Sequence, residues 1–376
     1  MRDDLTGRPA ATPPSSAAAP PVLGGATAPP GAGERPPRRP SWLRAVVLSL
    51  VVLAAGSVLG VAWYRLERSA SIQPPAVERT ADGWRVTAHQ QRAFSGLALS
   101  GDRLLWQNGA SIEYLDLASG DLRLLGPGPG MRTTWDPAVG DRYAVWFEAE
   151  REASLAVQAV AYDTESGRRW ILAEVGSVRS YPAISGDVAV WCSAATIGEP
   201  TINGARVGSG EAFEVAPGDG APVVSGSLVV WATGWTGPFV AGDLVTGTTW
   251  PVSASPTGAR LTAIALAGRT VVWGQGEADG SGVVATAAVD GGPTTTVASG
   301  ISGLSGPSYD GRTVVWAEQT ASGDRVMARR LGQAGAFVVA KADGAVTEVA
   351  VSGARVAWIQ RTGGSTHAVV VTRLPR

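Results

Sequence analysis

Few residues of this chain have the type and spacing that catalysis or metal binding requires. The sequence holds two histidines, His89 and His367, and one cysteine, Cys192. A metal bound by both histidines would still need further ligands and an open coordination position. A single cysteine forms neither an intrachain disulfide nor a cysteine-ligated metal centre. We therefore expect no metal and no cofactor, and we interpret both histidines as partly solvated side chains on outer strands.

Motifs of common active sites are absent from the sequence. There is no G-x-S-x-G segment, no P-loop and no G-x-G-x-x-G segment. The run GPGPG at 126–130 is interpreted as a connector, because proline lacks the backbone N–H that would bind a phosphate. The acidic run EAEREA at 148–153 could bind a cation, but it lacks the spacing of a calcium loop. A solvated hairpin tip is the favoured interpretation.

Composition excludes a general affinity for nucleic acid. The chain has 376 residues and a formal net charge of −1. Arginine is common and Lys341 is the only lysine, which we attribute to base composition of the genome. With no net positive charge, the chain produces no overall field that would attract phosphates.

The N-terminal part predicts a membrane anchor. Residues 1–41 are rich in Pro, Ala, Gly and Ser and are expected to form a disordered cytoplasmic tail. Residues 42–66 are expected to form a transmembrane helix, because the stretch 45–64 carries no charge and is long enough to span the hydrocarbon core of a lipid bilayer. Arginines are more numerous before this stretch than after it, which predicts an exported C-terminal part. Residues 67–82 would be a linker.

A cleaved signal peptide is the alternative to an uncleaved signal anchor. The apolar region of a signal peptide is usually about 7–15 residues long and precedes a small-x-small cleavage site. Here the apolar stretch is longer, and no convincing site follows it. A twin-arginine signal also matches poorly, so we favour the uncleaved anchor.

The rest of the chain is organised by a repeat. A glycine followed by a short apolar run that ends in tryptophan occurs seven times, and successive tryptophans are 40, 45, 40, 42, 43 and 42 residues apart. Recurrence in every unit favours a packing role for the tryptophans over ligand stacking, and a tight turn with positive φ for the glycines. The repeated residues are Trp106, Trp146, Trp191, Trp231, Trp273, Trp316 and Trp358, with Gly101, Gly140, Gly186, Gly226, Gly268, Gly311 and Gly353.

Each unit is predicted to form four short strands separated by Gly, Ser and Asp turns. Four strands in slightly more than 40 residues is typical of a propeller blade. We predict an all-β, seven-bladed β-propeller of four-stranded antiparallel blades over residues 83–376. The seventh unit lacks a fourth strand, whereas the segment 83–91 precedes the first unit and belongs to none. This segment is expected to pair with the last blade and close the ring.

The motifs YPAISGDVAVW and APVVSGSLVVW, with the turns DLASG and DLVTG, resemble the TolB-like group of bacterial β-propeller repeats. The resemblance covers about residues 83–376. It implies a propeller whose relatives include periplasmic interaction proteins, non-catalytic propellers of peptidases and certain polysaccharide lyases. No hydrolase domain follows the repeats, so the resemblance supplies no catalytic nucleophile.

Recognition is expected on one face of the propeller. The first and third turns of the units are short and alike, whereas the second turns and the links between units are longer and vary. Variable loops on a rigid scaffold are where binding residues usually lie, and aromatic and arginine residues dominate interface cores. The candidate binding residues on this face are Trp135, Tyr181, Trp235, Arg132 and Arg179. Alternatively, Trp135 and Tyr181 fill the central channel and the arginines are simply solvated.

These features predict a single-pass membrane protein whose exported propeller is a non-catalytic binding or scaffolding module of the cell envelope. Its partners would be the lipid bilayer through residues 45–64 and an envelope protein or cell-wall glycan. The alternative is an envelope glycan lyase or hydrolase with its site in the central pocket. Paired carboxylates or clustered histidines at the propeller axis would favour that enzyme. A third hypothesis is signalling through phosphorylation of the N-terminal tail.

Overall fold

The computed structural model describes residues 75–375 apart from 89–93, 151–156, 195–198, 235, 253–259 and 363–365. The expected tail, the expected membrane helix and residues 67–74 of the expected linker lie outside this part of the chain. The described residues contain no helix that is long and apolar enough to cross a membrane.

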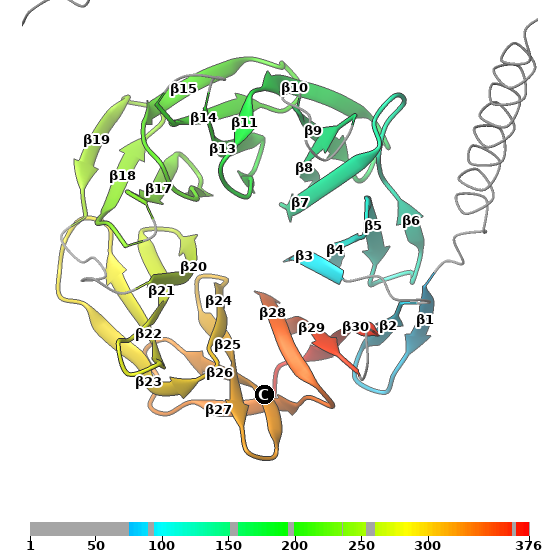
Figure 1. Ribbon diagram of the computed structural model, residues 1–376, viewed down its shortest axis with the longest axis vertical. Coiled ribbons are helices and arrows are strands. Elements are labelled where there is room, and N and C mark those ends of the chain that lie inside the picture. Colours follow the sequence, from blue (N-terminus) through cyan, green and yellow to red (C-terminus); the bar gives the residue numbers. More distant parts are fainter. Residues whose placement is uncertain are drawn as a thin grey trace, which may run out of the picture. The chain divides into compact units, whose positions relative to one another are not determined.

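The described residues form seven antiparallel sheets arranged as the blades of a ring (Figure 1). This arrangement confirms the predicted fold, a seven-bladed β-propeller. In blades 1, 2, 4, 5 and 6 the first strand lies at the inner edge and its successors follow outward in sequence order. In blade 3 both β11 (Ser177–Val178) and β12 (Ala183–Ser185) pair with the inner side of β13 (Val188–Ala194). The apolar runs that end in tryptophan become the second strands, and β17 (Leu228–Ala232) is buried along its whole length because neighbouring blades cover both of its faces.

The first six blades have the following strands. Blade 1 contains β3 (Phe94–Ser100), β4 (Arg103–Asn108), β5 (Ser111–Asp116) and β6 (Leu122–Leu124). Blade 2 contains β7 (Thr133–Val139), β8 (Tyr143–Ala149), β9 (Val157–Asp163) and β10 (Arg169–Val175). Blade 3 contains β11 (Ser177–Val178), β12 (Ala183–Ser185), β13 (Val188–Ala194), β14 (Thr201–Arg206) and β15 (Ala212–Pro217). Blade 4 contains β16 (Val223–Ser225), β17, β18 (Phe239–Asp243) and β19 (Thr248–Pro251). Blade 5 contains β20 (Arg260–Ala267), β21 (Thr270–Gly276), β22 (Ser281–Ala288) and β23 (Thr295–Ser302). Blade 6 contains β24 (Ser305–Tyr309), β25 (Thr313–Thr320), β26 (Gly323–Arg330) and β27 (Phe337–Lys341).

Blade 7 joins the two ends of the propeller sequence. It contains β28 (Ala345–Ser352), β29 (Arg355–Arg361) and β30 (His367–Arg373), and β30 pairs with β2 (Trp84–Thr87) from the N-terminal side. A fifth strand, β1 (Ala76–Arg79), pairs with β2 at the outer edge. Residues 76–79 therefore belong to the sheet and not to the linker expected over 67–82. The linker prediction was wrong there because it rested on the Pro-Pro pair just before β1, and the short, mostly exposed segment AVER carries no alternating pattern that indicates a strand.

Trp84 fastens the closing strand to the next blade. Its Nε1 donates a hydrogen bond of 3.1 Å to the carbonyl of Leu117 in blade 1, and the side chain is 8% exposed. A Cβ on Gly120 would lie 2.7 Å from the Trp84 ring, so glycine at this position lets the ring lie flat against blade 1. The closing strand thus contacts both blades that flank the seam.

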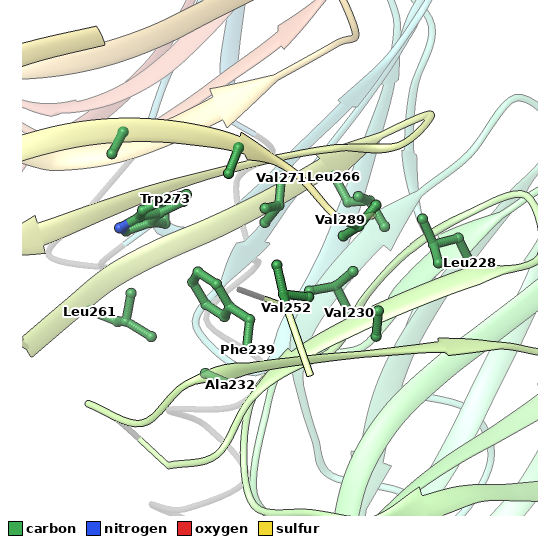
Figure 2. Close-up of a cluster of buried hydrophobic side chains, with 13 residues drawn as sticks. Leu228, Val230, Ala232, Phe239, Val252, Leu261, Leu266, Val271, Trp273 and Val289 are labelled. Carbon is green, nitrogen blue, oxygen red and sulfur yellow. The ribbon is translucent and has the colours of Figure 1, made fainter. Parts of the chain in front are cut away.

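The core lies between neighbouring blades. Figure 2 shows the cluster between blades 4 and 5, in which Val230 and Phe239 face Val271 and Trp273. The rings of Phe239 and Trp273 meet edge to face with centroids 5.3 Å apart. All seven repeated tryptophans are buried, with exposed fractions of 0–4%. Large rings at this position fill the space between blades with apolar area.

The repeated Ser-Gly pairs link blades through hydrogen bonds. The Oγ of Ser225 in blade 4 accepts the N–H of Gly268 in blade 5 at 2.9 Å, and Ser185 and Ser352 accept the N–H of Gly226 and Gly101 in the same way. Six of the seven repeated glycines have positive φ. Gly140 is the exception, because its unit carries one more residue between glycine and tryptophan and its turn closes by a bond from the Gly140 N–H to the carbonyl of Tyr143.

Candidate functional site

The inner strands, or in blades 3 and 4 the residues just before β12 and β16, bring one position of every repeat to the inner part of the ring. This position lies ten residues before the repeated tryptophan, and in most blades the register of the inner strand shifts at it or beside it. From blade 1 to blade 7 the residues there are Gly96, Asp136, Tyr181, Ala221, Ala263, Gly306 and Glu348. Only Asp136, Tyr181 and Glu348 carry polar side chains, so the polar groups at this ring position belong to blades 2, 3 and 7.

Gly96 lies between the two acidic residues. Its N–H donates a hydrogen bond of 3.0 Å to Glu348, and the N–H of Leu97 donates one of 2.6 Å to the second oxygen of the same carboxylate. On its other side, a Cβ at Gly96 would lie 3.6 Å from the Cα of Asp136 and 2.6 Å from the Pro137 ring. A side chain here would collide with the Pro137 ring, and the φ of +61° also favours glycine.

Asp136 is held in an unusual environment. It is the one residue other than glycine with positive φ, +58°, in the described part of the chain. Burial, and after it the negative charge of Glu348, raises its pKa to about 7. Its carboxyl has no hydrogen-bond partner among the described residues, whereas Glu348 uses both oxygens to hold β3. Strained backbone and a perturbed carboxyl are features found at functional sites.

Tyr181 connects this pair to a cavity. The cavity has a volume of about 310 Å³ and opens on the variable-loop face between the inner parts of blades 3, 4 and 5. Its lining includes Tyr181, Pro182, Pro222, Leu261 and Ile264. The Tyr181 side chain is 60% exposed, and its pKa is raised first by partial burial and then by the charges of Asp136 and Glu348. The tyrosine therefore lies within electrostatic reach of both carboxyls and at the edge of the cavity.

The walls of the cavity are fixed by backbone contacts. The N–H of Arg179 donates to the carbonyl of Cys192 at 3.0 Å, and the N–H of Cys192 donates to the Oγ of Ser180 at 3.0 Å. A Cβ on Gly220 would lie 1.9 Å from the carbonyl oxygen of Ala232, so this link lies directly on β17. Cys192 itself is fully buried, and burial raises the pKa of its thiol, which makes it a packing residue.

Two charged side chains stand at this cavity without ion-pair partners among the described residues. Arg179 and Asp219 both line it and both are exposed. Because they carry opposite charges, they add little net charge to the cavity. Asp136 and Glu348 lie in the adjoining part of the ring, and burial raises the pKa of both carboxyls, that of Asp136 to about 7, so the neutral and the charged form of Asp136 coexist near neutral pH.

The structure separates the residues that the sequence grouped as binding candidates. Arg179 and Tyr181 line the cavity together. Trp135 does not line it and packs against Phe147, with ring centroids 6.3 Å apart, on the core between blades. Arg132 is exposed beside blade 2 and also stays outside the cavity. Trp235 lies outside the described residues, although Gly234 beside it is part of the lining.

Two further expectations need correction. Glu148 is not part of a solvated tip: it is fully buried and accepts hydrogen bonds from Trp146, Arg169 and the N–H of Gly128 at 2.7–3.0 Å. The buried Glu148 carboxylate thus holds the connector 126–130 through the Gly128 N–H. The residues around Glu148 in the sequence give no sign of this burial. His367 is 8% exposed and lies on a strand in the middle of blade 7, not on an outer strand. His89 lies outside the described residues.

Among the described residues, no three His, Cys, Asp or Glu side chains converge as a metal site. Asp136 and Glu348 are nevertheless a carboxyl pair near the axis, which the sequence did not predict because they lie far apart along the chain. The signal that could have identified them is the position ten residues before each tryptophan. Such a pair can bind a cationic group, and a single carboxyl with a pKa near neutrality can also transfer a proton.

Comparisons with known proteins establish the fold. No family model and no curated protein matches the sequence. The propeller domain of the trilobed protease from Pyrococcus furiosus is similar, with a TM-score of 0.56 and 10% identity over 72% of this chain and 92% of that one. A puromycin-hydrolysing peptidase of Mycobacterium tuberculosis gives 0.53 and 12% identity, over 76% of this chain and 55% of the peptidase. TolB from Acinetobacter baumannii gives 0.43 and 11% identity, over 80% of each chain. The two likenesses with TM-scores above 0.5 show the fold, and the matching domain of the trilobed protease is a β-propeller.

Proposed function

We propose that the protein is a membrane-anchored binding module of the cell envelope that docks a partner protein on the variable-loop face of its propeller. Residues 42–66 would form the anchor, with the N-terminus in the cytoplasm and the propeller exported. The observation that carries the binding role is the cavity of about 310 Å³ with the exposed Tyr181 at its edge. Exposed aromatic residues beside a preformed pocket are typical anchor points of protein interfaces.

The rigidity of the cavity supports binding. Its walls are held by the hydrogen bonds of Arg179, Ser180 and Cys192 and by the close approach of Gly220 to Ala232. A preformed site loses little conformational entropy when a ligand enters, so more of the contact energy appears as affinity. Its volume is near the lower end of the range for ligand pockets, which suits one or two side chains of a partner.

Photo-crosslinking in intact cells tests the binding role. A photoreactive amino acid is placed at position 179 or 181, and in the control at position 245. Val245 is 80% exposed and lies in the third turn of blade 4, on the opposite face. We expect one reproducible protein adduct from positions 179 and 181 and none from 245. Equal adducts from all three positions, or no protein adduct at all, would contradict the proposal.

Thiol labelling tests the orientation in the membrane. The native Cys192 is fully buried, so it gives little background labelling. A Val245→Cys variant should react with a membrane-impermeant maleimide in intact cells when the propeller is exported. Labelling only after cell lysis would place the propeller in the cytoplasm and remove the envelope from the proposal.

An envelope glycan lyase or hydrolase is the second candidate, and the carboxyl pair at the axis is the observation that favours it. Glu348 is less suited to proton transfer, because both of its oxygens accept backbone N–H groups. Asp136 remains as a single acid–base group. Release of reducing or unsaturated sugar ends from purified cell-wall glycan by the wild-type chain, lost in Asp136→Asn, would establish the enzyme in place of the binding module.

A further inference from the structure

The cavity and the acidic residues beside it together indicate what kind of group the partner presents. The cavity is largely apolar, with Pro182, Pro222, Leu261 and Ile264 in its lining. At the Tyr181 edge the apolar lining ends, because Asp136 takes the same ring position in blade 2 that Tyr181 takes in the neighbouring blade 3. The Asp136 carboxyl has a pKa of about 7, so a cation that binds beside it would favour its charged form. A ligand complementary to both parts carries an apolar group and a positive charge side by side.

The Tyr181 ring is placed to contact such a cation. It is 60% exposed, and its π-face can attract an ammonium or guanidinium group. Asp136 is the neighbouring acid that has no hydrogen-bond partner among the described residues, whereas Glu348 is fixed by Gly96 and Leu97. The nearest residues on the same ring position in blades 4 and 5, Ala221 and Ala263, are small and neutral. Because Asp136 can carry a negative charge and the two alanines cannot, a cation at the cavity is attracted toward blades 2 and 3 and not toward blades 4 and 5.

We propose that the cavity binds a partner segment in which an apolar side chain adjoins a lysine or arginine, with the apolar side chain in the cavity and the cation between Tyr181 and Asp136. This inference rests on the proposed function and specifies the partner chemistry. The apolar side chain removes the lining from water, and the cation gains a charge partner in Asp136. An acidic segment would be repelled, so the site would discriminate between partners by charge.

Three short peptides test the charge preference directly. The probes are acetylated, amidated Gly-Leu-Lys-Gly, its norleucine counterpart Gly-Leu-Nle-Gly and the acidic Gly-Leu-Glu-Gly. Binding to the full-length chain in detergent is measured by saturation-transfer NMR, with each peptide also titrated into empty micelles. We expect the lysine peptide to bind roughly three- to ten-fold more tightly than the norleucine peptide, as cation–π contact and charge attraction predict. The glutamate peptide should bind most weakly.

Two matched variants locate the cation. Asp136→Asn keeps the size of the side chain, and asparagine tolerates positive φ, so the fold should persist. It should abolish the preference for lysine over norleucine. Asp219→Asn, on the other side of the cavity, should leave the preference intact. Loss of the preference in Asp219→Asn alone, equal binding of the lysine and norleucine peptides, or no binding of the lysine peptide would overturn the inference.

The crosslinking experiment separates this inference from the proposed function. A crosslinked partner whose contacting segment holds no lysine or arginine would leave the binding role standing and overturn the cation site. Selective binding of the lysine peptide without any protein adduct in cells would leave the cation site standing and contradict the role of the face in protein binding.

Discussion

The carboxylate of Glu348 in blade 7 accepts a hydrogen bond of 2.6 Å from the backbone N–H of Leu97 in blade 1. The same carboxylate accepts the N–H of Gly96, so one side chain satisfies two donors that the irregular register of β3 leaves unpaired. This contact crosses the seam between the first and last blades. The contact therefore joins the first and last blades and also fixes the position of Glu348 in the candidate site.

Glu348→Ala should destabilise the propeller by about 1–3 kcal/mol, because it leaves two partly buried N–H groups without an acceptor. The midpoint of urea unfolding, followed by tryptophan fluorescence, measures the effect. Glu214→Ala, on the outer strand β15 of blade 3, is the control and should change stability by less than about 0.5 kcal/mol. Equal midpoints for the two variants would show that the bridge does not stabilise the seam.

Asp136 should make the propeller less stable as the pH rises from about 4 to about 7. Its pKa is about 7 in the folded chain against an ordinary value of 3.8, so between these values the native state binds more protons than the unfolded state. Glu348 and Tyr181 are the titratable groups that interact with it. Asp136→Asn should remove this part of the slope and stabilise the chain at about pH 8 by roughly 1–3 kcal/mol.

Thermal unfolding across this pH range checks the Asp136 prediction. Asp121→Asn, which changes an exposed carboxyl on the turn before β6, should follow the wild type at every pH. An Asp136→Asn curve parallel to that of the wild type would show that Asp136 ionises like an ordinary exposed carboxyl.

The repeated glycines should differ in their tolerance of alanine. Gly268 has a φ of +56°, and no heavy atom lies within 4 Å of the place that a Cβ would take, so Gly268→Ala should cost about 1–2 kcal/mol through backbone strain alone. Gly140 lacks positive φ, and a Cβ there would meet Ile184 at an ordinary 3.7 Å. Gly140→Ala should be close to neutral. Chemical denaturation measures the free energy of unfolding of both variants. A larger loss of stability in Gly140→Ala than in Gly268→Ala would contradict the assignment of the turns.

The closing strand should be indispensable. Trp84→Ala removes a buried ring that bridges blades 7 and 1 and should cost about 3–5 kcal/mol. Deletion of residues 83–91 should abolish cooperative unfolding, because β30 would lose its outer partner. Circular dichroism and analytical size exclusion report the outcome. A monodisperse, β-rich protein after the deletion would show that the ring is closed by other contacts.

The periodicity of tryptophan was sufficient to predict the blades, because each unit repeats the same packing between neighbours. Local patterns failed where a distant residue determines the environment. Glu148 is buried where Arg169 and Gly128 donate hydrogen bonds to it. The spacing of residues within its own acidic run does not indicate these partners. Asp136 of blade 2 and Glu348 of blade 7 are far apart in the sequence and lie on either side of Gly96 only after the ring closes. The cavity likewise depends on three blades together, so only Arg179 and Tyr181 among its lining were predicted.

Hydroxyl-radical footprinting of Tyr181 is the most direct test of the claim that this face is occupied by a partner. Tyr181 and Leu124 are exposed to similar extents, 60% and 62%, and Leu124 lies on the outer strand of blade 1, away from the cavity. Both residues should be labelled in the purified chain. In intact cells we expect labelling of Tyr181 to fall several-fold while that of Leu124 stays the same. Undiminished labelling of Tyr181 in cells would contradict the account.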